Sequence, residues 1–405
     1  MMENPRVLIV ADDLTGAMDS AGPFAEIGVE TWVVAAPMHC DPARIARARV
    51  VSVNTDSRHL PPAQAATRVR DVVRAIGHGA FDVIVKKIDS TLRGNVVAET
   101  LALLETSGRR GAVIAPAFPA QGRTVKNGMV HVNGVPLAQT AFARDALSPP
   151  PVAPLQQVFA EARPGLTVAI SGAADDFSSG SNVRIWITDG TTDADLAATV
   201  SAVQHQFAEL LLAGSAGITK VLARACFGAA TSKAAPEKLT GTIVFVVGSR
   251  AVQSAEQVES LMREPGTKML RAPNGRLSQN EFPAVRILVL KATTDDAGEE
   301  GDALQVAADM ARNALEAARR THAQALVATG GDTAIAILRV SGNPALQVLG
   351  DLMPGIPYAR IRVDGAPLWL VTKAGGFGGR DTFRQIARRL RAEVAREFTE
   401  RNSGK

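Results

Sequence analysis

Short runs rich in valine and isoleucine recur along this chain, and each is separated from the next by a segment long enough for a helix. Such runs are typical of parallel strands buried on both faces, and their alternation with helices predicts an α/β fold. Ligands of such sheets bind beyond the carboxyl ends of the strands, so function is sought directly after each run. The strands expected in the first half are Val7–Val10, Thr31–Val34, Val50–Val53, Val83–Val85, Val113–Ile114, Thr167–Ile170 and Arg184–Ile187.

The chain has 405 residues, more than one ordinary core accommodates, so its length favours two domains. A small, polar, proline-containing stretch at Gly228–Leu239 predicts a linker, and a new strand is expected over Thr242–Val247. We therefore expect domains over residues 1–230 and 240–405, each a largely parallel sheet flanked by helices, with the active site in the cleft between them. Further strands of the second domain are expected at Arg286–Leu290, Ala325–Ala328 and Leu368–Thr372.

The charge balance argues against nucleic acid as a partner. Lysine and arginine number 44 against 40 aspartates and glutamates, and aromatic residues make up only 4% of the chain. Nucleic-acid binders are more basic and place stacking aromatic side chains among the charges. The densest basic stretch belongs to an expected C-terminal helix, whose arginines form a solvated face opposite an apolar stripe. That stripe is Phe383, Ile386, Leu390, Val394 and Phe398.

The cysteines and the N-terminus favour a cytoplasmic location. Cys40 and Cys226 lie far apart without the paired spacing of a zinc site, so neither a metal site nor a disulfide framework is expected from them. The chain begins MMENPRVLIVADD, without a basic leader or cleavage site, and no apolar run approaches about 20 residues. We expect a cytoplasmic protein without a membrane partner, and the oligomeric state stays open, a homo-oligomer included.

Charged turns follow three of the expected strands in the first half. Asp12 and Asp13 come directly after the first strand, where a carboxylate can bind a substrate hydroxyl, take its proton or hold Mg²⁺. Arg58 follows a later strand, and its guanidinium can grip a substrate carboxylate. Each turn also has a plainer interpretation, because an acid can cap the next helix and an arginine can lie on the surface.

The third turn, KKIDSTLRGN at residues 86–95, is the densest in charge. Lys87 and Arg93 are suited to hold an acid group, while Asp89 and Ser90 can bind hydroxyls. A turn that only caps a helix is the alternative. It is less expected here because this is the third polar turn at the same edge of the sheet.

A hairpin is expected within residues 116–145. Residues alternate around Met129–Val132, and Asn133-Gly134 is a typical turn. The segment is either a structural flap or a part of the cleft to which Arg123 and His131 contribute.

The second half places glycines after its strands. The segments are VGSR at 247–250, ATGGDTA at 328–334 and TKAGGFGG at 372–379. Glycines let backbone N–H groups approach phosphate oxygens, and a helix that begins after Thr333 directs its positive end toward them. No GxxxxGK[ST] motif occurs, and Gly376-Phe377-Gly378 lacks the third glycine of a dinucleotide fingerprint. A nucleotide site here must therefore have another design.

These segments together resemble the four-carbon acid sugar kinase family. The shared motifs are ADDLTGAMDSAG, TDSR, KKIDSTLRGN, the block from PAFPAQGRT to HVNGVPLAQTAFARD, GGDT and TKAGGFG, in the family's order and over nearly the whole chain. KIDSTLRGN and HVNGVPL are more similar to the branch that acts on D-threonate than to the branch that acts on 3-oxotetronate. The resemblance implies a sugar-acid-binding N-terminal domain, an ATP-binding C-terminal domain and phosphorylation of the terminal hydroxyl to a 4-phosphate.

The charged turns, the glycine loops and the resemblance together predict site residues. Asp12 is expected to orient or deprotonate the attacking hydroxyl, and Mg²⁺ is expected with ATP, with its protein ligands unknown. The predicted substrate contacts are Asp12, Asp13, Arg58, Lys87, Ile88, Asp89, Ser90 and Arg93. The predicted ATP contacts are Ser249, Gly330, Gly331, Asp332, Thr333, Gly375 and Gly376.

Other activities stay open at this point. Erythronate and 3-oxotetronate are alternative acids, because such substrates differ by single groups. A metal-dependent phosphohydrolase could use the acids after the first strand, but Asp12 and Asp13 are adjacent, and neighbours in an extended chain point to opposite faces. A non-catalytic sugar-acid-binding protein would not need three glycine loops in its second half.

Overall fold

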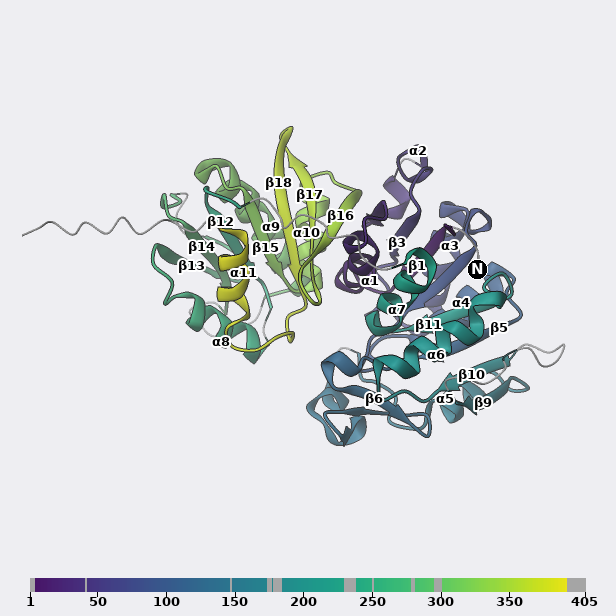
Figure 1. The fold of residues 1–405 in the computed structure, drawn as a ribbon. Coiled ribbons are helices and arrows are strands. Elements are labelled where there is room, and N and C mark those ends of the chain that lie inside the picture. Colours follow the sequence, from purple (N-terminus) through teal and green to yellow (C-terminus); the bar gives the residue numbers. More distant parts are fainter. Residues whose placement is uncertain are drawn as a thin grey trace, which may run out of the picture.

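The computed structural model describes residues 4–40, 42–145, 148–172, 177, 184–228, 238–249, 251–277, 281–294 and 301–391. Two lobes lie side by side: an N-terminal lobe up to residue 228, purple to teal, and a C-terminal lobe from residue 238, green to yellow (Figure 1). Within the described residues, one sheet of fifteen strands runs through both lobes. The predicted α/β fold with two largely parallel halves is confirmed.

The N-terminal lobe contributes eight strands, and every neighbouring pair is parallel. Most are buried along their whole length, because helices cover both faces of the sheet. In sheet order the strands are β2 (Thr31–Val34), β3 (Val50–Asn54), β1 (Val7–Ala11), β4 (Val83–Lys87), β11 (Leu210–Gly214), β5 (Gly111–Ala115), β10 (Arg184–Thr188) and β9 (Thr167–Ser171). The helices are α1 (Leu14–Glu26), α2 (Pro42–Ile45), α3 (Pro62–Ile76), α4 (Val96–Ser107), α5 (Leu155–Ala162), α6 (Asp193–Val203) and α7 (Ala216–Phe227).

The C-terminal lobe continues the sheet with five parallel strands and two antiparallel ones. In sheet order they are β13 (Thr267–Pro273), β14 (Ile287–Thr293), β12 (Ile243–Val247), β15 (Ala325–Thr329), β18 (Ala366–Lys373), β17 (Ile356–Val363) and β16 (Ala345–Met353). The helices are α8 (Val252–Leu261), α9 (Ala303–Thr321), α10 (Gly331–Val340) and α11 (Thr382–Leu390).

The two lobes share strands and a core at their seam. Strand β16 pairs antiparallel with β2, with Ala345 opposite Val34. Met18 and other buried residues of α1 belong to the same hydrophobic cluster as β12, β14 and β15. A Cβ at Gly22 of α1 would lie 2.0 Å from Oδ1 of Asp351 on β16, so any larger residue there would require the Asp351 side chain or the helix to move. The first helix of the N-terminal lobe therefore packs against both lobes, because Phe24 of the same helix belongs to the N-terminal core.

Every strand predicted from the sequence is present. Thr31–Val34 has the predicted bounds, and the others differ at their ends by a few residues. The predicted hairpin is also present as an antiparallel sheet of β6 (Arg123–Lys126), β7 (Met129–Val132) and β8 (Val135–Pro136). The apolar stripe is confirmed in α11 through Leu390, whereas Val394 and Phe398 lie outside the described residues, as does most of the predicted linker. Among the described residues, no helix combines the length and apolar character needed to cross a membrane. The cytoplasmic location stays a prediction.

Candidate active site

A cavity of about 240 Å³ lies where the two lobes meet. The N-terminal lobe contributes the turns after β1, β3 and β4, and the C-terminal lobe contributes the start of α10 and the loop after β18. Carboxyl ends of parallel strands meet at one edge of a sheet, which is why turns far apart in sequence converge here. The predicted residues that line the cavity are Asp13, Arg58, Lys87, Asp89, Ser90, Arg93, Gly331, Gly375 and Gly376.

Arg58 holds both acids of the first turn. Its Nε and Nη2 donate to Asp12 at 2.8 and 2.9 Å, and its Nη1 and Nη2 donate to Asp13 at 2.8 and 2.9 Å. Asp13 also caps α1, because its Oδ1 accepts a hydrogen bond from the backbone N–H of Gly16 at 2.8 Å. Asp12 is only 3% exposed and does not line the cavity. Thus Asp13 faces the cavity, and Asp12 lies behind Arg58.

The same arginine affects the two carboxyl groups differently. Burial acts to raise the pKa of both, and the charge of Arg58 acts to lower it. For Asp12, the charges of Arg58, Lys86 and Lys87 prevail over burial, and the pKa lies below its ordinary value. For Asp13, burial and the neighbouring charge of Asp12 prevail, and the pKa is raised. Asp12 is therefore the more firmly ionised of the two.

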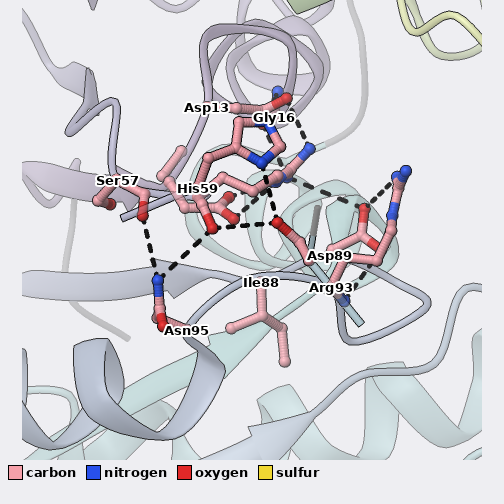
Figure 2. Close-up of polar contacts among 12 residues, drawn as sticks. Asp13, Gly16, Ser57, His59, Ile88, Asp89, Arg93 and Asn95 are labelled. Carbon is pink, nitrogen blue, oxygen red and sulfur yellow. Dashed lines mark hydrogen bonds and ion pairs between the residues drawn. The ribbon is translucent and has the colours of Figure 1, made fainter. Parts of the chain in front are cut away.

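Asp89 organises the turn after β4. Its carboxylate accepts hydrogen bonds from Arg93 Nη2 at 2.9 Å and Nε at 3.1 Å, and from the backbone N–H of Thr91 at 3.0 Å (Figure 2). Burial acts to raise the pKa of Asp89, but the charges of Arg93 and Arg58 hold it far below its ordinary value. Ile88 is 1% exposed, packs in the core and does not line the cavity, so the position of its side chain does not support the predicted substrate contact.

The two lysines of this turn have separate surroundings. Lys86 is buried and forms an ion pair with Glu99 of α4 at 2.8 Å, and Glu99 also accepts a hydrogen bond from Ser57 at 2.7 Å. Lys87 donates to the carbonyl oxygen of Ile88 at 3.0 Å and has no carboxylate ion pair within the described ranges. Lys86 is therefore structural. Lys87 lies at the cavity wall without an ion-pair partner among the described residues, and its charge acts on Asp12, Asp13 and Asp19.

Asn95 fixes the turn after β3 to the turn after β4. Its Nδ2 donates to the carbonyl oxygen of Ser57 at 3.1 Å (Figure 2). It also donates to the carbonyl oxygen of Leu60 at 2.8 Å. In the same region, His59 Nδ1 and Ser148 Oγ are hydrogen-bonded at 2.9 Å. These contacts set the position of Arg58, which lies between Ser57 and His59 in the chain.

In the C-terminal lobe, the start of α10 faces the start of α1. Gly330 has φ +100°, a conformation that favours glycine, and α10 begins at the next residue. A Cβ at Gly331 would lie 3.3 Å from Thr15 Oγ1 and 3.4 Å from Asp13 Oδ2. The positive end of α10 is therefore adjacent to the cavity. Asp332 is exposed and outside the cavity wall.

Two other glycine segments meet beside it. A Cβ at Gly375 would lie 2.2 Å from Ser249 Oγ, and a Cβ at Gly330 would lie 3.8 Å from the side chain of Ser249. A Cβ at Gly248 would lie 2.2 Å from Oγ1 of the buried Thr333. The structure thus brings all three glycine segments together, with Gly331, Gly375 and Gly376 at the cavity wall.

Lys373 lies beneath the loop after β18. Its Nζ donates to the carbonyl oxygens of Ala374 at 2.7 Å and of Gly375 and Phe377 at 3.0 Å. Ser254 donates to the same Gly375 carbonyl at 2.9 Å. No acid pairs with Lys373 in the described part of the chain, and burial lowers its pKa to about 7. The carbonyl groups of this loop are therefore directed into the lobe.

Sequence reasoning missed several residues of the cavity wall. Asp19 on α1 is the most informative, because it lies three residues after Gly16 and so shares its helix face, a spacing that could have indicated it. Arg123 lines the cavity, but His131 does not, and its Nδ1 is hydrogen-bonded to the carbonyl oxygen of Met129. The other missed residues are Thr15, Gly16, Thr91, Phe118, Gln121, Phe142, Ser215, Ala216, Gly355, Ala374 and Phe377.

Comparison with known proteins agrees with the division of the site between an N-terminal and a C-terminal lobe. Residues 7–222 match a family described as a sugar-binding N-terminal domain, and residues 244–383 match a nucleotide-binding C-terminal domain. The chain is similar to the D-threonate kinase of Cupriavidus necator, with 34% identity over 92% of this chain and 94% of that protein. It is also similar to the D-threonate kinase of Bordetella bronchiseptica (29% identity, covering 98% and 100%) and the 3-oxo-tetronate kinase of Burkholderia multivorans (29%, covering 95% and 97%).

A solved structure of a Haemophilus influenzae protein shows the same fold, with a TM-score of 0.68 at 20% identity over 94% of this chain and 98% of that one. Matches to both domain families, together with the full-length similarity to curated kinases, confirm the resemblance drawn from the motifs. The chain belongs to the four-carbon acid sugar kinase family.

Proposed function

We propose that this protein transfers the γ-phosphoryl group of ATP to a hydroxyl of a four-carbon sugar acid, with D-threonate as the substrate and D-threonate 4-phosphate as the product. The observation that carries this proposal is that charged turns of one lobe and glycine segments of the other line the same cavity. The substrate is inferred from the relatives named D-threonate kinase. Erythronate and 3-oxotetronate are the alternative acids, since other relatives carry those names.

The division of labour follows the lobes. Residues 1–230 would bind the sugar acid, and residues 240–405 would bind the nucleotide. The domain families matched by residues 7–222 and 244–383 support these roles. Phosphoryl transfer depends on positioning and charge stabilisation, and a site between two lobes can supply both while excluding water.

The acid would be held by cations of the cavity wall that form no ion pair with the described residues of the protein. Arg58 and Arg93 already bind Asp12, Asp13 and Asp89. Lys87 and Arg123 line the cavity without a carboxylate ion pair among the residues described. We assign the substrate carboxylate chiefly to these two, while Ser90 at the cavity wall would bind a hydroxyl.

The nucleotide phosphates would bind at the start of α10 and the loop after β18. Gly331, Gly375 and Gly376 line the cavity there, and their N–H groups would bind phosphate oxygens, with Ser249 beside Gly375. Thr333 supports this arrangement from the core through its contact with Gly248. Asp332 is exposed next to the same turn and remains a predicted contact.

Mg²⁺ is expected with ATP. The described residues contain no group of three or more His, Cys, Asp or Glu side chains that could hold a metal ion. Mg²⁺ in kinases is commonly held by one or two carboxylates together with substrate phosphates, so the residues present fit the ion. Asp13, beside Gly331, would supply the carboxylate, and the ion would neutralise charge that develops on the phosphates.

Measurement of ADP release with a panel of four-carbon sugar acids tests the proposal. ADP release that requires an acid, with the highest kcat/KM for D-threonate, is expected. A preference for erythronate or 3-oxotetronate would correct the substrate. Phosphate release from a phosphorylated acid without ATP would instead show a hydrolase, and acid binding without ATP binding would show a sugar-acid-binding protein.

A further inference from the structure

The carboxylates of the cavity wall are not equivalent. Asp13, Asp19 and Asp89 are its acids. Asp13 is bound by Arg58 and Asp89 by Arg93. Asp19 has neither an ion pair nor a hydrogen bond to any side chain in the described ranges. It is therefore the one cavity acid among the described residues whose lone pairs are all available to a ligand.

Asp19 is also placed between the two halves of the site. It lies on α1, the helix that packs into the core of the C-terminal lobe, and borders the same cavity as Gly331 and Gly375. The groups that act on its charge come from several elements: Lys87 at the end of β4, Asp13 before α1, Asp89 after β4, and Asp351 on β16. Only Lys87 among these stabilises a negative charge on Asp19.

Keeping an unpaired carboxylate in this place is unfavourable for the free protein. Burial is the main cause and raises the pKa of Asp19 to about 6, with the charges of Asp13 and Asp89 adding to it. A group that is costly in the free protein and open to the cavity is typical of a functional residue. A general base is most effective when its pKa lies near the working pH.

We propose that Asp19 is the catalytic base, which accepts the proton of the substrate hydroxyl that attacks ATP. This inference rests on the proposed kinase activity. The hydroxyl oxygen forms a bond to the γ-phosphorus as the bond from that phosphorus to the bridging oxygen breaks, and ADP leaves with the electron pair. The hydroxyl proton moves to an Oδ atom of Asp19 and later passes to water. Asp12, held by Arg58, then acts as a positioning residue.

Asp19→Asn tests the assignment, with Glu26→Gln on the same helix as the matched control, because Glu26 is exposed and outside the cavity. We expect kcat of Asp19→Asn to fall by roughly 100-fold or more, with KM for ATP and acid changing less than about threefold. The acidic limb of the kcat profile, with a midpoint near pH 6 in the parent, should disappear in Asp19→Asn. Its melting temperature at pH 7 should not fall, which separates loss of a base from loss of the fold.

Three outcomes overturn the assignment. Turnover of Asp19→Asn within about fivefold of the parent excludes a base, given the size that general-base catalysis usually has. Recovery of turnover at high Mg²⁺ would make Asp19 a metal ligand instead. An unchanged acidic limb would place the titrating group elsewhere. Absence of ADP release by the parent with every acid would refute the proposed function itself, and the inference about Asp19 with it.

Discussion

Arg58 grips Asp12 with two parallel hydrogen bonds, from Nε to Oδ2 at 2.8 Å and from Nη2 to Oδ1 at 2.9 Å. A second pair of bonds joins the same guanidinium to Asp13. Four donor positions are thereby used within the protein, which leaves little of Arg58 for a substrate carboxylate. We therefore propose that Arg58 chiefly fixes the two acids of the first turn, and its predicted contact with the substrate carboxylate stays a prediction.

We predict that Asp12→Asn lowers kcat far more than it weakens ATP binding. The amide presents an NH₂ group to a guanidinium that needs acceptors, so Arg58 shifts and Asp13 loses its fixed position. A fall in kcat of roughly 10- to 100-fold is expected, with ATP affinity by calorimetry changed less than about threefold. Asp56→Asn, at an exposed ion pair, is the control. Near-normal turnover would remove Asp12 from the mechanism.

Arg123→Gln should weaken recognition of the acid group. The guanidinium of Arg123 lies 5.7 Å from the ring centre of Phe142, its Nε has no partner among the described residues, and burial lowers its pKa. We expect KM for the sugar acid to rise by roughly 10- to 100-fold, the range for a hydrogen bond to a charged group. The ratio of kcat/KM for the acid to kcat/KM for the matching neutral polyol should fall by the same factor. The control Arg163→Gln, which does not line the cavity, should leave this ratio unchanged. An unchanged preference would contradict the assignment.

Sequence patterns identified the strands because burial on both faces leaves a continuous apolar run, as in β1 and β12. Strands β11, β13, β16 and β17 were not named from the sequence. Strands β16 and β17 are antiparallel, and polar residues such as Arg360 interrupt their apolar positions, whereas β11 and β13 are parallel. The pairing of β16 with β2 depends on contacts between the lobes, which local patterns do not encode.

Only part of the site could be predicted, because local sequence patterns do not encode contacts between distant side chains. The end of a strand identifies a turn, so the charged residues of the three N-terminal turns and several glycines at the cavity wall could be named. Side-chain packing decides which acid forms an ion pair with which arginine, so the pairing of Arg58 with Asp12 was not predicted. Asp19 was missed because it follows no strand and lies within a helix.

Glu99→Gln should destabilise the fold. Lys86 and Glu99 are each 1% exposed, and the amide would leave the lysine charge buried without a counter-charge. We expect a loss of roughly 3–5 kcal/mol in the free energy of unfolding, measured by urea denaturation. The matched control is Glu209→Gln in the exposed pair with Arg110, for which at most about 1 kcal/mol is expected. Equal losses in the two variants would mean that burial does not determine how much an ion pair contributes to the free energy of unfolding.

Gly375→Ala should disrupt the loop that borders the nucleotide site. The added Cβ would lie 2.2 Å from the Oγ atom and 3.0 Å from the Cβ atom of Ser249, so either the loop or the side chain of Ser249 must move. We expect KM for ATP to rise at least about tenfold, since displacement of one backbone contact commonly has such an effect. Gly379→Ala, where nothing lies within 4 Å, is the control in the same loop. Ser249→Gly should restore part of the loss in the double variant, and no restoration would contradict the steric cause.

Lys373 makes the free energy of unfolding depend on pH. Burial lowers the pKa of Lys373 from 10.5 to about 7, so between these values the unfolded chain binds a proton that the folded chain does not. The contribution of this group to the free energy of unfolding therefore increases as pH rises from about 7 toward 10.5, and is constant below that window.

Lys373→Met removes the titrating group. The free energy of unfolding of this variant should rise less than that of the parent when both proteins are denatured with urea from pH 7 to 10. The variant also loses the donor to three loop carbonyl groups, so KM for ATP should increase at every pH. Parallel stability profiles for the two proteins would show that Lys373 keeps its proton throughout, and the loop would then be held by a charged lysine.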